Sequence, residues 1–366
     1  MNGGFISIWA SLIIVGLFMP FIPYMTRKTE NFGISIPEHL YNRMDFKKMR
    51  KKYTSYLFVV FVLLLIIASL LFYMLPEKLS ILFISIVIML ELVASFVLYL
   101  WFHFEMKKIK QSENWTQENK QGVVIDTTFR DEKLTHSNWW FLVPGMIILG
   151  TIIFTNFMYD QIPNEIPMHT DFSGNVRYDN KTIGNMLLMP AMQLFMLGMF
   201  LCINLVIKHS KQQLSGANPD RSKFQNVLFR RYWSLYMILS SLLMVLLFGF
   251  VQITFIYPTL ETYTELVITV TIIILLLGTI LLSIKTGQGG SRIKIEDKEV
   301  NKNIDRDDDR YWKLGQFYVN KNDPSIFIEK RFGVGWTNNW AHPLSWVFIV
   351  GIIALPIIIV SILIYL

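Results

Sequence analysis

Side chains that could bind a ligand or a metal ion gather in one polar segment, residues 160–181. His169 lies in this segment with carboxylates on both sides, and an imidazole together with carboxylates can hold a divalent cation. The carboxylates are Asp160, Glu165, Asp171 and Asp179. Their spacing matches no established ligand pattern, so we predict neither a metal site nor a cofactor here.

Two prolines, Pro163 and Pro167, restrict the backbone of the same segment. Each proline fixes φ at about −65° and removes a backbone donor, so the segment can be neither a helix nor an interior strand. Asp171, Ser173 and Gly174 follow, a composition typical of a tight turn. The sequence therefore predicts a rigid loop, which would lose little conformational entropy on binding a ligand. The alternative is a loop that only caps and joins the two flanking helices.

A second candidate for chemistry is Glu91, which lies near the middle of an apolar run. An ionisable side chain at that depth of a membrane costs about 3 kcal/mol unless it is paired or neutral, so we expect it to face other helices or a wet cavity. Its candidate partners are the polar residues Asn156, Gln193, Asn204 and Gln252. Two alternatives stay open: a protonated Glu91 satisfied by a neighbouring helix, and amides that form structural hydrogen bonds between helices.

These residues belong to a chain that is built for a membrane. The 366 residues are 53% hydrophobic and only 17% charged, which is too apolar for a soluble protein. Eight segments are long enough to cross about 30 Å of hydrocarbon. They lie at about 5–25, 55–74, 79–102, 138–158, 183–207, 234–257, 266–284 and 344–365. We predict an all-α polytopic membrane protein with about eight transmembrane helices.

Lysine and arginine are distributed very unevenly among the connections between these spans. The connections 26–54, 103–137, 208–233 and 285–343 contain 31 of the 34 basic residues. Cationic connections are retained in the cytoplasm, so both termini and the segment 160–181 should face outward from the plasma membrane. Attraction to anionic membrane lipids also accounts for the net charge of +7. We exclude nucleic acid as a partner because no recognition motif accompanies the basic residues.

The pattern of apolar and polar stretches divides the chain into five regions. They are an N-terminal three-helix membrane region (1–137), a helix-loop-helix unit (138–207), a two-helix membrane region (208–284), a cytoplasmic segment (285–343) and a last helix (344–366). Within the cytoplasmic segment, the charged and glycine-containing residues 285–309 are interpreted as a flexible linker. Residues 317–319 and 326–329 flank a strong turn at 320–324, which predicts a small β-hairpin rich in aromatic residues. We interpret it as a docked structural module.

The polar segment also contains a recognisable pattern, P-x-x-I-P-x-H, followed by a glycine and a lysine and flanked by spanning helices. Its residues are Pro163, Ile166, Pro167, His169, Gly174 and Lys181. The pattern resembles the motif of the SdpI-like membrane family, a domain of unknown function, and the resemblance runs from Asn138 to Ile207. The family commonly has an aromatic residue soon after the histidine, where this chain has Asp171 and Phe172. The motif W-K-x-G-x-F-Y-x-N from Trp312, together with N-D-P at 322–324 and G-x-G-W at 333–336, resembles a second uncharacterised module that accompanies this family in Firmicutes.

The resemblance implies a function, because SdpI-like proteins include immunity proteins that protect Gram-positive bacteria against a secreted peptide toxin. It implies an immunity or sensor protein whose outer loop binds a peptide or an envelope ligand, with a cytoplasmic regulator as a further candidate partner. The ligand-binding residues would be Pro163, Ile166, Pro167, His169, Asp171 and Gly174. The alternative is a proton-coupled transporter or permease that uses Glu91. We predict no enzymatic activity, because a nucleophile with its base, a metal cluster and a phosphate cradle are all missing from the sequence.

Overall fold

The computed structural model describes residues 3–113, 121–122, 132–170, 176–214, 218–295, 304–305 and 308–364. Eight helices within these residues are long and apolar enough to cross a membrane. They confirm the prediction of an all-α polytopic membrane protein. The sheets in the described residues are small, with two strands each.

The long helices follow the predicted apolar runs in order. They are α1 (Gly3–Phe18, continued by the short 3-10 helix η1, Met19–Tyr24), α2 (Met44–Met74), α3 (Glu77–Glu113), α5 (Leu142–Phe157, preceded by η4, Asn138–Phe141), α6 (Ile183–His209), α7 (Pro219–Ile256), α8 (Thr264–Thr286) and α9 (Pro343–Ile364). Many of their large apolar side chains are exposed. This is expected of helices in lipid, where a helix satisfies its own backbone hydrogen bonds.

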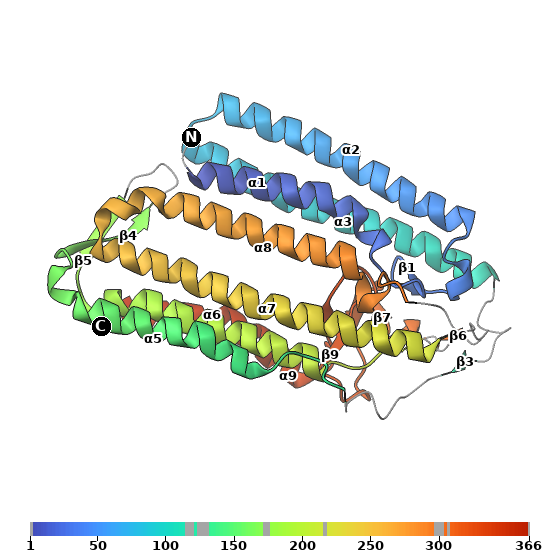
Figure 1. Ribbon diagram of the computed structural model, residues 1–366. Coiled ribbons are helices and arrows are strands. Elements are labelled where there is room, and N and C mark those ends of the chain that lie inside the picture. The colour runs from blue at the N-terminus through green and yellow to red at the C-terminus, as the bar shows by residue number, and fades with distance from the viewer. Residues whose placement is uncertain are drawn as a thin grey trace.

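The helices run side by side in two groups. Figure 1 shows α1, α2 and α3 on one side of α8, and α7, α6, α5 and α9 on the other. Helix α8 packs against both α1 and α7, so it joins the two groups. Within the second group, α7 packs against α5 and α6, and α6 packs against α9.

The two ends of this bundle differ in structure. One end carries the antiparallel strands β4 (Glu165–Thr170) and β5 (Val176–Asn180). The first helix, α1, begins at this end, and the last helix, α9, ends there (Figure 1). We call it the hairpin end. The opposite end, which we call the basic end, carries β1 (Glu30–Asn31) with β2 (Ile34–Ser35), β3 (Gln121–Gly122) with β6 (Ile304–Asp305), and the strands before α9. The predicted separation of the proline-rich segment from the C-terminal module is thus confirmed.

The C-terminal module, residues 308–342, contains two short hairpins where we predicted one. Strand β7 (Trp312–Lys313) pairs with β8 (Phe317–Tyr318), and β9 (Phe327–Glu329) pairs with β10 (Trp336–Asn338). The predicted pairing of 317–319 with 326–329 is therefore wrong.

Turn geometry explains the different pairing. Gly315 between β7 and β8, and Gly333 and Gly335 between β9 and β10, have positive φ values of 68°, 85° and 115°. Glycine adopts this region without steric cost, so these positions close the two hairpins. The stretch 320–324 links the hairpins instead, and the side-chain amide of Asn339 donates to the backbone oxygen of Asn320 at 2.9 Å.

The glycine cluster Gly287–Gly290 is packed, although the sequence suggested a flexible linker. Gln288 is fully buried and exchanges two hydrogen bonds with the backbone of Gly335, at 2.9 and 2.7 Å. A Cβ on Gly290 would lie 2.2 Å from the backbone oxygen of Gln225, so only glycine permits this close approach to α7. The linker interpretation is wrong for these residues. Residues 296–303 and 306–307 of the same predicted linker lie outside the described residues.

Three helices continue beyond their apolar runs at the basic end. Helix α2 begins at Met44 instead of near residue 55, α3 ends at Glu113 instead of near residue 102, and α7 begins at Pro219 instead of near residue 234. Asn218 caps α7 by accepting a hydrogen bond from the backbone nitrogen of Arg221 at 3.1 Å, and proline is well tolerated in the first turn. The extension of α7 brings Arg230 into the interior, where its side chain is fully buried.

Candidate functional site

The proline-rich segment forms a two-stranded antiparallel hairpin, β4 with β5. Pro167 pairs with Tyr178 and His169 pairs with Arg177, with an irregularity in the register between Pro167 and His169. Both strands are edge strands, where a residue without a backbone N–H is accepted. The segment is therefore neither a helix nor an interior strand, as predicted, but it is more regular than the loop we expected.

The base of the hairpin is fixed in an apolar cluster. Ile162 and Ile166 lie in this cluster with Met186 of α6 and with Phe255 and Ile256 of α7. Each of these side chains is 5% exposed or less. Burial of one such side chain contributes roughly 1.5–3 kcal/mol. The base of the strand is consequently anchored on two helices.

Lys181 ties together the two ends of the hairpin segment. Its Nζ donates to the backbone oxygens of Tyr159 and Ile162, each at 3.0 Å. It also lies 4.4 Å from the centre of the Tyr159 ring, a cation-π geometry. The backbone nitrogen of Lys181 donates to the oxygen of Asn164 at 2.7 Å. This lysine of the predicted motif therefore has a structural role.

The predicted ligand-binding residues differ in their surroundings. Ile166 is fully buried and anchors the strand instead of facing a ligand. Pro163 is exposed and Pro167 is half-buried. The backbone of His169 lies in β4, whereas Asp171 and Gly174 lie outside the described residues. Among the described residues, no three side chains of His, Cys, Asp or Glu lie together so as to hold a metal ion.

Glu91 is fully buried in the α1–α3 group. A Cβ added to Gly16 of α1 would lie 2.5 Å from Glu91 Oε1 and 2.2 Å from the ring of Phe61, so the missing side chain of Gly16 makes room for both groups. Neither carboxylate oxygen of Glu91 has a hydrogen-bond partner in the described part of the chain. The prediction that Glu91 faces other helices is confirmed.

The predicted partners of Glu91 make their contacts elsewhere, in the α5–α7 group. Three of them are buried and donate hydrogen bonds between neighbouring elements of that group. The bonds run from Gln193 to the backbone oxygen of Val245 (2.8 Å), from Asn204 to Asn138 Oδ1 (2.9 Å) and from Gln252 to Thr155 Oγ1 (3.2 Å). The fourth, Asn156, is exposed. The pairing with Glu91 is therefore wrong, and the alternative of structural hydrogen bonds is confirmed for the three buried amides.

The basic end contains buried charges that the sequence analysis missed. Glu329 of β9 is fully buried and pairs with Arg230 of α7, at 3.3 Å, and with Arg27, which follows η1. Asn226 Nδ2 donates to Glu329 Oε1 at 2.8 Å. Removing charges from water costs several kcal/mol per ion, so such a set is tolerated only when the partners are complete. The carboxylate of Glu329 thus attaches the C-terminal module both to α7 and to the segment that follows η1.

A second set of charges surrounds Arg331. It pairs with Asp308 and Asp309 and donates to the backbone oxygen of Gly33 at 3.2 Å. Lys110 of α3 donates to Asp309 Oδ2 at 2.6 Å. Burial alone would raise the pKa of Asp309, but the charges of Arg331 and Lys110 outweigh it and lower that pKa to about 2. The module is therefore also attached to α3.

A signal for these charges was present in the sequence. An acid and two basic residues interrupt the apolar stretch I-F-I-E-K-R-F, residues 326–332. Charged groups among apolar residues must find partners when the stretch is buried. The partners themselves were not recognisable, because Arg230 is 99 residues from Glu329.

Helix α7 connects the hairpin base with the buried charges. Phe255 and Ile256 at its C-terminal end lie in the cluster with Ile166, and Arg230 near its N-terminal end pairs with Glu329. The helix is continuous over 38 residues. One continuous helix therefore contacts both the hairpin base and the C-terminal module.

Comparison with known families finds two matches. Residues 146–194 match a domain of unknown function (DUF1648). DUF1648 is found in SdpI-like membrane proteins. Residues 321–346 match a family of unknown function (DUF5808). No curated protein and no solved structure matches the chain.

The two matches coincide with the two features described above. The DUF1648 match covers most of α5, the hairpin and the first part of α6, so it agrees with the SdpI-like resemblance of 138–207. The DUF5808 match covers β9 and β10, and with them Glu329 and Arg331. Helix α7 lies in neither match and makes contact with both.

Proposed function

We propose that this multi-pass membrane protein is an immunity or sensor protein of SdpI-like type whose β4–β5 hairpin binds a peptide or an envelope ligand. The observation that carries the proposal is the anchored base of the hairpin. Ile166 is buried there and Lys181 joins its two ends. A ligand would have to order few further dihedral angles on binding such a preorganised segment, so less binding free energy is lost.

The hairpin offers the chemistry that an extended peptide needs. Each strand of a two-stranded sheet has one edge whose backbone N–H and C=O groups have no partner in the sheet. A peptide can bind such an edge as an additional strand. The side chain of Arg177 is 75% exposed and Tyr178 is 50% exposed, so a cation and an aromatic ring are available beside the backbone.

In this proposal the hairpin end faces the cell exterior, because nearly all basic residues lie in connections at the opposite end. Single cysteines test this orientation, with Cys202→Ser as background and Arg177→Cys or Lys321→Cys as reporters. Both reporter positions are exposed. A membrane-impermeant maleimide should label Arg177→Cys in intact cells and Lys321→Cys only after permeabilisation. The reverse pattern would contradict the orientation.

Ligand binding at the hairpin would be transmitted to the C-terminal module through α7. The hairpin base shares an apolar cluster with Phe255, and Arg230 of the same helix pairs with Glu329. The module would then change its docking or present a surface to a cytoplasmic regulator. In this proposal the region matched by DUF1648 binds the ligand, and the region matched by DUF5808 responds to it.

Growth inhibition by secreted peptide toxins tests the function. Cells that produce the protein should tolerate at least one peptide of a toxin panel at a higher concentration than cells without it. His169→Ala and Tyr178→Ala should abolish this protection. Asp160→Asn is the matched control, because Asp160 is exposed at the same end but lies outside both strands. Equal sensitivity of cells with and without the protein, or full protection by both hairpin variants, would refute the proposal.

A second candidate function is a proton-coupled transporter or permease. It is favoured by Glu91, a fully buried carboxylate without a hydrogen-bond partner among the described residues. One pair of variants separates the two functions. Glu91→Gln should abolish a transport activity and leave protection intact, whereas His169→Ala should abolish protection and leave transport intact.

A further inference from the structure

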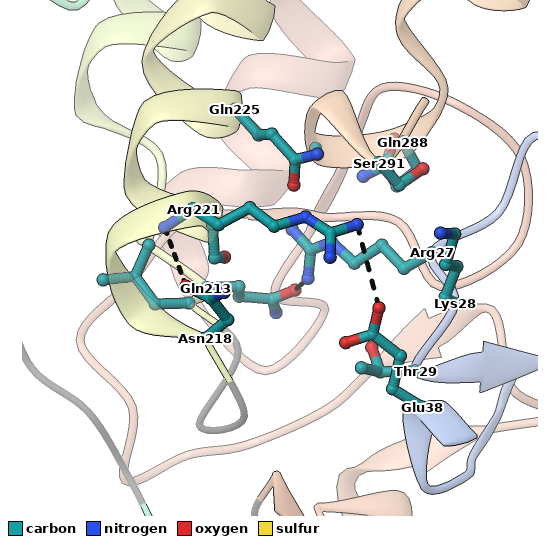
Figure 2. A pocket seen from close by; sticks show the side chains of 13 residues that line it. Arg27, Lys28, Thr29, Glu38, Gln213, Asn218, Arg221, Gln225, Gln288 and Ser291 are labelled. Atoms are coloured by element: carbon teal, nitrogen blue, oxygen red, sulfur yellow. Dashed lines mark hydrogen bonds and ion pairs between the residues drawn. The ribbon is translucent and has the colours of Figure 1, made fainter. Parts of the chain in front are cut away.

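The carboxyl group of Glu91 has surroundings unlike those of the carboxylates at the basic end. There, Glu329 pairs with the buried Arg230. Figure 2 shows Glu38 facing Arg221 beside a polar cavity at the same end, with an N–O distance of 3.9 Å. Glu91 is fully buried, and no hydrogen bond or ion pair joins either of its oxygens to another residue in the described part of the chain.

The neighbours of Glu91 along α3 offer it no polar group. One turn toward the hairpin end, Val87 lies in an apolar cluster with Leu12 of α1. One turn toward the basic end, the hydroxyl of Ser95 is hydrogen-bonded to the hydroxyl of Tyr53, at 3.1 Å. Residues four apart share a face of a helix, so both belong to the immediate surroundings of Glu91.

Two other helices enclose the carboxyl group. A Cβ on Gly16 of α1 would lie 2.5 Å from Glu91 Oε1 and 2.2 Å from the ring of Phe61 of α2. Along α3, roughly 16–18 Å of apolar helix separates Glu91 from either end of the run 79–102. The group therefore lies deep in the bundle, far from water at both ends.

The helices around Glu91 bring no cation to this depth. The runs 3–24, 53–74, 79–102 and 266–284, which belong to α1 with η1, α2, α3 and α8, contain no lysine, arginine or histidine. The charged groups of α8 are Glu265 in its first turn and Lys285 in its last turn. On α3, His103 follows the apolar run. These titratable and charged groups all lie near the ends of the spans.

An ionised carboxylate is stable in an apolar site only with a counter-charge or with hydrogen-bond donors. A metal ion is a poor substitute, because hard cations need several oxygen ligands. Ser95 and Tyr53 already bond to each other, and no three His, Cys, Asp or Glu side chains of the described residues gather to hold a metal ion. A proton needs no further ligand and removes the charge.

We propose that Glu91 is a proton-binding site within the membrane and that its carboxyl group is protonated at neutral pH. The site is independent of the ligand proposed at the hairpin. Its use as the ion site of a carrier rests on the second candidate function, whereas the bound proton itself does not. The tests below measure the proton without measuring transport.

A carbodiimide that dissolves in lipid reports such a group, and the reagent is dicyclohexylcarbodiimide. The carboxyl O–H adds across one C=N bond of the reagent, so that the oxygen bonds to the central carbon and the proton passes to a nitrogen. The acyl group then shifts to a nitrogen, and the stable N-acylurea retains every atom of both reactants. Peptide mapping by mass spectrometry of the full-length protein in detergent should find this adduct on Glu91.

Infrared spectroscopy detects the proton directly, because the C=O band of a protonated carboxyl group is separate from the bands of a carboxylate. Glu91→Gln should lose both this band and the adduct. Glu105→Gln is the matched control, because Glu105 is an exposed glutamate of the same helix. It should retain both signals. Peptide mapping of the wild type decides if Glu91→Gln does not fold.

Three results would overturn the proposal. They are a protonated-carboxyl band as strong in Glu91→Gln as in the wild type, a wild type in which the reagent modifies other carboxyl groups but not Glu91, and an equal loss of both signals in Glu105→Gln. A protonated Glu91 in a protein without transport activity would refute the transporter and support the proton site. An ionised Glu91 in a protein that transports would refute the proton site alone.

Discussion

Arg230 of α7 and Glu329 of β9 form an ion pair at 3.3 Å in which neither side chain is exposed. The other groups of Arg230 are also satisfied, since its Nη1 donates to the backbone oxygen of Ile207 at 2.7 Å and its Nε to Asn226 Oδ1 at 2.7 Å. A buried pair of this kind gives little net stability in itself, but a missing partner is costly. The attachment of the C-terminal module to α7 therefore depends on the carboxylate of Glu329, whereas its attachment to α3 runs through Asp309 and Lys110.

Glu329→Gln should destabilise the protein by about 3–5 kcal/mol, because the buried Arg230 and the half-buried Arg27 lose their shared carboxylate. Lys321→Gln changes an exposed side chain of the same module and should stay within about 0.5 kcal/mol of the wild type. Unfolding in detergent measures both. The double variant Glu329→Gln/Arg230→Met should be less destabilised than the sum of the single variants. Simple additivity would contradict a direct pairing.

Docking of the module should weaken in acid, between about pH 4 and pH 2. The pKa of Asp309 is lowered to about 2, and hydrogen bonds led by that from Lys211 overcome burial and lower the pKa of Asp323 to about 2. A carboxylate with a lowered pKa stabilises the fold at every pH above its ordinary value of 3.8. This contribution is lost as protons bind when the pH falls toward the folded-state pKa.

Tryptophan fluorescence measures this transition, since Trp312 is buried in the module. The signal should be constant from about pH 8 to pH 5 and change below about pH 4. Asp309→Asn should be less stable at neutral pH and should show a flatter acid transition. A transition centred near pH 6.5 would indicate histidine and would contradict this origin.

The membrane spans could be predicted because every segment that crosses lipid needs a long apolar run. Their boundaries at the basic end could not, because α7 continues into polar sequence that packs against the C-terminal module. Arg230 was therefore assigned to a connecting loop, although it is fully buried. Its partner Glu329 is 99 residues away, and a single sequence contains no sign of that contact.

The hairpin shows the same division between local and tertiary information. Pro163 and Pro167 predicted its position and its exclusion from helices, because proline acts through its own backbone. The burial of Ile166 against Phe255 depends on where α7 ends in space. Glu91 lies in the α1–α3 group, whereas the amides of Gln193 and Gln252 lie in the α5–α7 group. The apolar runs predict each helix but do not predict which helices pack together.

Gly16→Ala should destabilise the α1–α3 group by about 1–3 kcal/mol, as overpacking commonly does. The added Cβ would lie 2.2 Å from the ring of Phe61 and 2.5 Å from Glu91 Oε1. Gly198→Ala in α6 is the control, because no atom lies within 4 Å of its added Cβ. It should be neutral or stabilising by up to about 1 kcal/mol. Thermal unfolding measures both, and equal effects of the two variants would contradict the close packing at Gly16.

Lys181→Met should loosen the hairpin without unfolding the helices, because it removes the two hydrogen bonds that join Tyr159 and Ile162 to the end of the segment. Hydrogen exchange of amides in β4 and β5 should accelerate about tenfold or more, since each charge-assisted bond contributes roughly 1.5–3 kcal/mol. Arg177→Met is the matched control, as it removes a largely exposed charge from the same hairpin. Its exchange should stay close to that of the wild type. If Lys181→Met exchanges no faster than Arg177→Met, the base of the hairpin is held by the apolar cluster around Ile166 alone.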